Sequence, residues 1–219
     1  LLYGMYPDVI NNFGAEYEIL KNLVSSYLYK DILALAGIRK SDVLEKILRA
    51  LALQIGSEVS YNEIAQLVGV DKNTVNNYIN LLEKSYVVFR LTSFSKNIRN
   101  EIKANKKIYF YDNGVLNMLI GNFTTFQLRQ DKGALWENFL VSERMKQLSY
   151  KQSIAKSFFW RTTTQQEIDY IETNADEVSA YEFKWATNKK VKLPKSFMEA
   201  YNPSFLVVNK DNFREFLNK

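Results

Sequence analysis

Two short stretches in the last third of the chain decide the fold: Glu-Ile-Asp-Tyr-Ile at residues 167–171 and Tyr-Glu-Phe-Lys-Trp at residues 181–185. Both are rich in β-branched and aromatic residues, which favours strands. Side chains alternate between the two faces of a strand, so Glu182 and Lys184 share one face. If the two strands pair as neighbours, Asp169 lies beside them. The pattern therefore predicts two acids and one amine on a single sheet face.

The same alternation assigns the remaining side chains of these strands. It places Ile168 and Tyr170 on one side of the first strand, with Asp169 and Ile171 on the other. The sequence pattern predicts that these two strands belong to a meander, with a helix before it and a strand and a helix after it. This order indicates a small mixed α/β layer. The predicted elements are helices at 134–148 and 212–217 and strands at 157–160, 168–171, 179–185 and 206–208.

A second pattern precedes this layer. Ser60 and Glu63 have the spacing of a capping box, which predicts a helix start, and Gly69 predicts its end. A further helix begins at Asp71 or Asn73, so the order is helix, tight glycine turn, helix. A strand at 86–92, a basic loop and a strand at 108–111 follow. This order is typical of a winged helix, and a three-helix unit that packs against protein remains the alternative.

The predicted second helix and the basic loop offer nucleic-acid contacts. Asparagine and lysine side chains donate to phosphates and base edges, although the helix has few cations. The basic loop is the better phosphate binder, unless it is only a solvated loop. The candidates are Lys72, Asn73, Asn76 and Asn77 on the helix and Lys96, Arg99, Lys103 and Lys106, followed by Lys107, in the loop.

These patterns divide the chain into four parts. Residues 1–40 form a helical lead-in, with one helix from Glu16 to Ala36 that Gly37 ends. Residues 41–112 form the winged-helix-like module and residues 113–133 a connector. Residues 134–219 form the mixed sheet flanked by helices. The fold class expected is α/β (α+β overall).

The composition excludes several kinds of chemistry. The chain has 219 residues, no Cys and no His, with 47% hydrophobic residues and a net charge of +5. Disulfides, thiolate or imidazole catalysis, and Cys- or His-ligated zinc are therefore excluded. Catalysis would depend on carboxylates, Lys, Tyr, hydroxyls or a hard cation such as Mg²⁺ or Mn²⁺. The basic balance permits DNA as a partner.

Missing motifs narrow the expectations further. No apolar run approaches the ~20 residues of a membrane span, and no phosphate-binding loop motif occurs, so we expect neither a membrane partner nor an ATP site in this stretch. The N-terminus has no secretory signal and no initiator Met, which suggests a fragment. We therefore expect a soluble, cytoplasmic protein.

The ordered set Glu137, Asp169 and Glu182-Phe183-Lys184 resembles the PD-(D/E)XK nuclease superfamily. More closely, residues 133–143, 167–171 and 181–185 resemble a domain of unknown function found C-terminal to prokaryotic AAA-type ATPase domains. This resemblance continues through residues 1–9, the glycine-turn helices and residues 107–116. It implies a restriction-endonuclease-like sheet here and an ATPase domain, absent from this sequence, as a partner.

The resemblance also implies roles for the site residues. Asp169 and Glu182 would hold Mg²⁺ or Mn²⁺, Lys184 would orient water or stabilise developing charge, and Glu137 would hold a water or a second metal. The turn before Asp169 departs from the family pattern, because it reads Thr-Gln-Gln-Glu at 164–167 rather than glycine-rich. Two readings stay open beside DNA cleavage. In the first, the acids and the lysine are simply a salt-bridge cluster on the protein surface. In the second, the domain is a non-catalytic module that binds nucleic acid or a protein partner.

Overall fold

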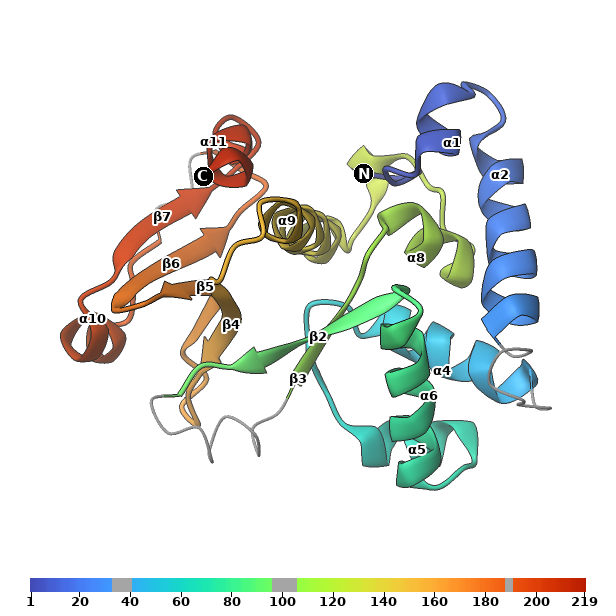
Figure 1. Cartoon of the computed structure of the whole chain (residues 1–219), viewed down its shortest axis with the longest axis horizontal. Coiled ribbons are helices and arrows are strands. Elements are labelled where there is room, and N and C mark those ends of the chain that lie inside the picture. The colour runs from blue at the N-terminus through green and yellow to red at the C-terminus, as the bar shows by residue number, and fades with distance from the viewer. Residues whose placement is uncertain (33–40, 96–105, 188–190) are drawn as a thin grey trace. The chain divides into compact units, whose positions relative to one another are not determined.

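The structure, a computed structural model, describes residues 1–32, 41–95, 106–187 and 191–219. The chain forms two compact units (Figure 1). Unit 1 contains residues 1–90 and 108–131, and unit 2 contains residues 91–107 and 132–219. Seven strands form one mixed sheet in the order β1-β3-β2-β4-β5-β6-β7, flanked by helices. The mixed α/β class expected from the sequence is confirmed. No helix within the described ranges is long and apolar enough to cross a membrane.

Unit 1 is mainly helical. Its elements are α1 Pro7–Asn11, α2 Glu16–Leu23, the π-helix η1 Val24–Asp31, α4 Ser41–Leu53, β1 Glu58–Val59, α5 Tyr61–Val68, α6 Lys72–Lys84, α8 Asn113–Ile120 and the 3₁₀ turn η2 Phe126–Leu128. Two strands, β2 Val88–Ser93 and β3 Lys106–Phe110, carry residues of both units.

The two helices predicted on either side of Gly69 are present. The Ser60 hydroxyl accepts a hydrogen bond from Glu63 N at 3.3 Å and starts α5, and Gly69 ends it with a left-handed backbone at φ 79°. The Asp71 carboxylate accepts from Thr74 N at 2.9 Å and starts α6. Each helix therefore begins at a side-chain cap that satisfies an otherwise unpaired N–H group.

The single α-helix predicted from Glu16 onward is wrong in part. After α2 the chain continues as the π-helix η1, and Gly37 lies outside the described residues. The buried apolar residues recur every fourth position, at Leu20, Val24, Leu28 and Ile32. Residues four apart drift by about 40° per step around an α-helix. The wider π turns oppose that drift, which keeps the four side chains on one buried stripe.

Unit 2 is a three-layer arrangement of helices on a sheet. Its elements are α9 Lys132–Tyr150, β4 Lys156–Arg161, β5 Glu167–Asn174, β6 Glu177–Phe183, α10 Lys195–Tyr201, β7 Ser204–Val208 and α11 Phe213–Asn218. Strands β4, β5 and β6 are antiparallel neighbours, whereas β7 runs parallel to β6 and β4 runs parallel to β2.

The two faces of this sheet are covered by different helices. On one face Phe197 of α10 is fully buried in a cluster with Phe158, Ile171 and Ala180. On the other face the ring of Phe216 from α11 packs on aromatic side chains of the sheet; these are Tyr170, Tyr181 and Phe183. Helix α10 was not predicted, and the strand predicted to reach Trp185 ends at Phe183.

A register shift in β5 corrects the predicted alternation. Phe158 pairs with Ile171 and Trp160 with Ile168, so β5 carries one residue more than β4 between these pairs. This extra residue at Asp169–Tyr170 is a β-bulge. As a result Ile168 and Ile171 both enter the same core cluster, whereas strict alternation predicted opposite faces.

A buried ion pair ties α9 to the sheet and to α11. Arg144 Nε and Nη2 donate to the two Glu172 carboxylate oxygens at 2.6 and 2.7 Å. Arg144 Nη1 also donates to the Phe216 carbonyl oxygen at 3.2 Å. Both charged side chains are buried. The two parallel hydrogen bonds fix the relative position of α9, β5 and α11 within unit 2.

Candidate functional site

Asp169 on β5 and Glu182 on β6 are neighbouring acids. The pairing of the two strands ends at Tyr170 and Tyr181, and Asp169 and Glu182 are the next residue of each strand. The two side chains are only 14% and 9% exposed, and they interact with each other. Two carboxylates this close repel unless a proton or a cation lies between them.

Lys184 supplies one such cation. Its Nζ atom donates to Glu182 Oε2 at 2.8 Å and to Asp169 Oδ2 at 3.3 Å. Asp169 Oδ2 also accepts a hydrogen bond from Phe183 N at 2.8 Å, which fixes the carboxylate against the strand. Backbone hydrogen bonding from Lys184 N to Val208 O at 2.9 Å holds β6 in place beside β7. The structure therefore brings the predicted acids and amine together on one face.

The electrostatics of this cluster favour a proton on one acid. Burial, together with the Asp169 carboxylate, raises the pKa of Glu182 from 4.5 to about 7, although Lys184 opposes the shift. Burial lowers the pKa of the Lys184 ammonium, but Asp169 and Glu182 outweigh burial and raise it overall. Lys184 therefore stays charged at neutral pH, whereas Glu182 exchanges a proton near neutrality.

Glu137 contacts a lysine that the sequence reading had assigned to the basic loop. Lys107 Nζ lies 3.1 Å from Glu137 Oε1 and 2.5 Å from Glu167 Oε1. Its side chain is 1% exposed, and its ammonium lies 5.4 Å from the centroid of the Phe159 ring. The expectation that Lys107 is part of a solvated phosphate-binding loop is therefore wrong. A cation is buried there because two carboxylates and an aromatic ring surround it.

Glu167 was not predicted as a site residue, although it belongs with Glu137, Asp169 and Glu182 to the acidic region of unit 2. It lies at the start of β5, just after the turn at 162–166, where Thr162 N donates to Gln166 O at 2.9 Å and Gln165 has a positive φ of 65°. The turn that departs from the glycine-rich family pattern thus ends in an acid that binds Lys107. A charged lysine that contacts one predicted site acid and one acid that was not predicted, 30 and 60 positions away along the chain, gives no local signal in the sequence.

The residues predicted to contact nucleic acid differ in their exposure. Lys72, Asn73 and Asn77 are exposed on α6, and Lys106 is partly exposed at the start of β3. Lys96, Arg99 and Lys103 lie outside the described residues. Asn76 is partly buried, because Arg90 of β2 lies against that side of α6.

Arg90 is the centre of a polar cluster within unit 1. Its guanidinium donates to Asn80 Oδ1 at 2.8 Å and to Tyr61 Oη at 2.7 Å, and it forms an ion pair with Glu83. A longer contact of 3.5 Å reaches Asn76 Oδ1. The side of α6 that carries Asn76 and Asn80 is therefore engaged inside the protein, whereas Lys72 and Asn73 at its N-terminal end are exposed.

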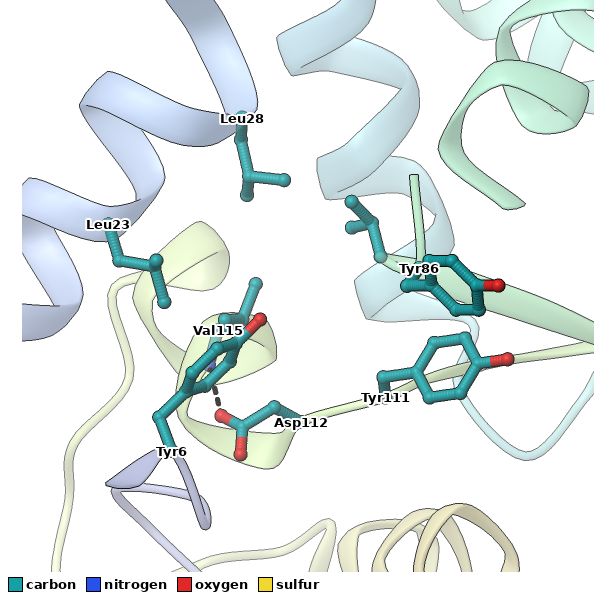
Figure 2. A pocket seen from close by; sticks show the side chains of 8 residues that line it. Tyr6, Leu23, Leu28, Tyr86, Tyr111, Asp112 and Val115 are labelled. Carbon is teal, nitrogen blue, oxygen red and sulfur yellow. Dashed lines mark hydrogen bonds between the residues drawn. The ribbon is translucent and has the colours of Figure 1, made fainter. Parts of the chain in front are cut away.

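Unit 1 also contains a small, mainly apolar pocket (Figure 2). Figure 2 shows Tyr6, Leu23 and Leu28 on one side and Tyr86 and Tyr111 on the other. The one carboxylate among its lining side chains, Asp112, accepts hydrogen bonds from Val115 N at 3.0 Å and Met5 N at 2.6 Å. It caps α8 and holds the N-terminal segment, so this pocket offers no chemistry that rivals the acidic cluster of unit 2.

Comparison with protein families gives a match to the N-terminal part of the chain. The family described as Domain of unknown function (DUF8612) matches residues 1–125, which is more than half of the sequence. The chain belongs to the DUF8612 family. Residues 132–219 match a second family, Domain of unknown function (DUF4143). The expected similarity to a domain of unknown function is confirmed, and neither family description names a nuclease.

Curated relatives of this DUF8612 member come from bacteria and an archaeon. An uncharacterized protein of Haemophilus influenzae is 24% identical over 98% of this chain and 50% of its own length. An uncharacterized protein of Mycobacterium tuberculosis is 29% identical over 68% of this chain and 34% of its own length. An uncharacterized protein of Methanocaldococcus jannaschii is 22% identical over 77% of this chain and 37% of its own length. The chain thus spans half or less of the relatives' length. No solved structure matches it.

Proposed function

We propose that unit 2 is a PD-(D/E)XK-like nuclease domain that hydrolyses DNA phosphodiesters with a divalent cation, within a longer prokaryotic AAA-type ATPase. The observation that carries this proposal is the contact of one ammonium, Lys184 Nζ, with both Asp169 and Glu182. The matched family DUF4143 and the length of the relatives support the placement beside an ATPase domain.

The donor set fits a hard divalent cation. Asp169 and Glu182 offer carboxylate oxygens, the ligands that Mg²⁺ and Mn²⁺ prefer. Burial, together with the nearby Asp169 carboxylate, raises the pKa of Glu182 to about 7, and a divalent cation would relieve the repulsion between the two carboxylates. Within the described residues no group of three or more acids surrounds a common metal position, so water or substrate oxygens would complete the shell. The cation would supply Lewis acidity toward a phosphate ester.

Orientation of the metal ligand and stabilisation of the developing charge would come from the groups around Asp169, Glu182 and Lys184. Phe183 N keeps Asp169 in a fixed orientation, which preorganises one ligand before substrate binds. The Lys184 ammonium is 29% exposed, so it can donate to a phosphate oxygen as negative charge develops there. Glu182 changes protonation near neutral pH and therefore is available as a ligand only once its proton leaves.

Unit 1 would contribute a DNA contact of the winged-helix type. The exposed side chains of α6 that carry donors suited to phosphates and base edges are Lys72 and Asn73 in the first turn and Asn77 one turn later. An N-terminal end of a helix also favours anions. Asn76 belongs to the internal Arg90 cluster and is left out of this proposed contact.

A second candidate is a binding module that does not cut. It is favoured by the internal neutralisation of the acids: Lys184 already pairs with Asp169 and Glu182, while Lys107 pairs with Glu137 and Glu167. A cluster that is compensated in this way needs no metal to fold. In that case unit 2 would bind nucleic acid or a protein partner through its surface.

One experiment separates the two candidates. The chain is incubated with plasmid DNA and Mn²⁺, and compared with Lys184→Ala, Glu182→Ala and the exposed control variants Lys210→Ala and Glu199→Ala. Cleavage that persists in the controls and is lost by at least ~100-fold in the site variants supports the nuclease. Salt-sensitive binding by all proteins without cleavage supports the binding module.

A further inference from the structure

The acidic region of unit 2 contains a built-in cation that the reaction proposed above does not use. Lys107 Nζ lies between Glu137 Oε1 at 3.1 Å and Glu167 Oε1 at 2.5 Å. The lysine side chain is 1% exposed, and Asp169 adds to the negative field that keeps it charged. An ammonium buried this deeply is tolerated only where fixed negative partners surround it.

The three side chains come from three different elements. Lys107 lies on β3, Glu137 on α9 and Glu167 at the first position of β5. The Phe159 ring of β4 packs against the ammonium, with the centroid 5.4 Å away. A fourth element therefore closes the position from the side. This is the arrangement of a closed cation site, in which the cation is supplied covalently by the chain itself.

We propose that the Lys107 ammonium takes the place of a second metal ion between Glu137 and Glu167. Glu137 is then not a metal ligand, and unit 2 binds one divalent cation, at Asp169 and Glu182. Lys107 is then a positioning residue: it fixes Glu137 and Glu167 without touching the reacting atoms. The number of one ion rests on the proposed function, whereas the role of Lys107 does not.

The test counts bound ions rather than activity. Mn²⁺ is titrated into the chain and the free ion is followed by electron paramagnetic resonance. Lys107→Met keeps an unbranched stem of similar length over Phe159 but removes the charge, which leaves Glu137 and Glu167 to repel each other. We expect one Mn²⁺ in the unmodified chain, two in Lys107→Met, and one again in Lys107→Met combined with Glu137→Gln.

The outcomes distinguish this inference from the proposed function. If the unmodified chain binds no Mn²⁺ and Lys107→Met binds one, the role of Lys107 holds and the proposed metal site fails. If both bind one, the proposed metal site holds and the role of Lys107 is overturned. Two ions in the unmodified chain also overturn it.

A second pair of variants covers the case in which Lys107→Met does not fold. Glu137→Gln in the otherwise unmodified chain should leave both the number of Mn²⁺ ions and their affinity unchanged, because Glu137 is not a ligand. Lys107→Arg should likewise keep the ion count, since it retains the internal charge. A tenfold loss of Mn²⁺ affinity in Glu137→Gln would contradict the inference.

Discussion

Arg144 binds both carboxylate oxygens of Glu172 in the interior of unit 2, at 2.6 and 2.7 Å. Removing one partner of a buried pair leaves an uncompensated charge, which typically costs ~3–5 kcal/mol. We therefore expect Glu172→Ala to lower the free energy of unfolding by about this amount in urea titrations. The partly exposed pair of Lys146 and Glu143 offers a control, and Lys146→Ala should cost no more than ~1 kcal/mol. Similar losses in both variants would contradict the prediction.

Glu182 should make stability depend on pH in the opposite sense to an ordinary acid. Its pKa is about 7 in the folded chain against 4.5 when unperturbed, so the folded state binds more protons between these values. The free energy of unfolding then falls as pH rises from about 4.5 to about 7. The loss approaches ~3 kcal/mol, since each pKa unit corresponds to 1.36 kcal/mol.

Urea unfolding at pH 5 and pH 8, with chelator present, measures this effect. Glu182→Gln should remove most of the difference between the two pH values. Glu199→Gln, which changes an exposed acid on α10, should retain it. A pH dependence that is the same in both variants would assign the effect to another group.

Gly114 should accept no side chain, although it lies in a helix. A Cβ atom there would overlap the backbone carbonyl of Tyr3 and also lie 2.9 Å from Asp112 Oδ1. Since the obstacle is main chain, Gly114→Ala should destabilise unit 1 by ~1–3 kcal/mol in thermal or urea unfolding. Gly133→Ala in α9 is the matched change, because a Cβ there meets nothing within 4 Å. We expect it to be neutral or stabilising by up to ~1 kcal/mol.

Lys72 should contribute one phosphate contact if α6 binds DNA. Lys72→Ala should weaken binding to unrelated sequences alike and reduce the dependence of log affinity on log salt by about one charge. Fluorescence anisotropy with labelled duplexes at several salt concentrations measures both effects. Lys84→Ala, at the exposed C-terminal end of the same helix, should leave the salt dependence unchanged. Equal changes in the two variants would point to general electrostatic attraction instead.

The predictable part of unit 2 was the part governed by strand alternation and short spacing. Glu182 lies on β6 and Lys184 directly follows its end, and the spacing of two residues still brings the two side chains together. Asp169 joins them because β5 and β6 are joined by a tight connection and pair directly. The placement of Ile168 could not be predicted in this way, since the bulge adds one residue to β5 and changes the alternation.

Contacts between distant segments account for what sequence reading missed. Lys107 sits among other lysines in the sequence, and only the approach of α9 and β5 turns it into a buried cation. Arg144 and Glu172 are 28 positions apart and look like ordinary surface charges until α11 covers them. In unit 1 the capping residues Ser60 and Asp71 could be predicted from the sequence, because their hydrogen bonds are local. The contact between Arg90 and Asn76 could not be predicted, because it joins β2 to α6.

The Asp169 carboxylate also has a structural role, because its Oδ2 atom accepts a hydrogen bond from Phe183 N in place of a main-chain carbonyl oxygen. Asparagine can accept that bond through its side-chain oxygen and leucine cannot. If Asp169 is a metal ligand as proposed, Asp169→Asn should therefore lose the charge needed for metal binding and keep the folded strand, whereas Asp169→Leu should lose the charge and also destabilise the strand.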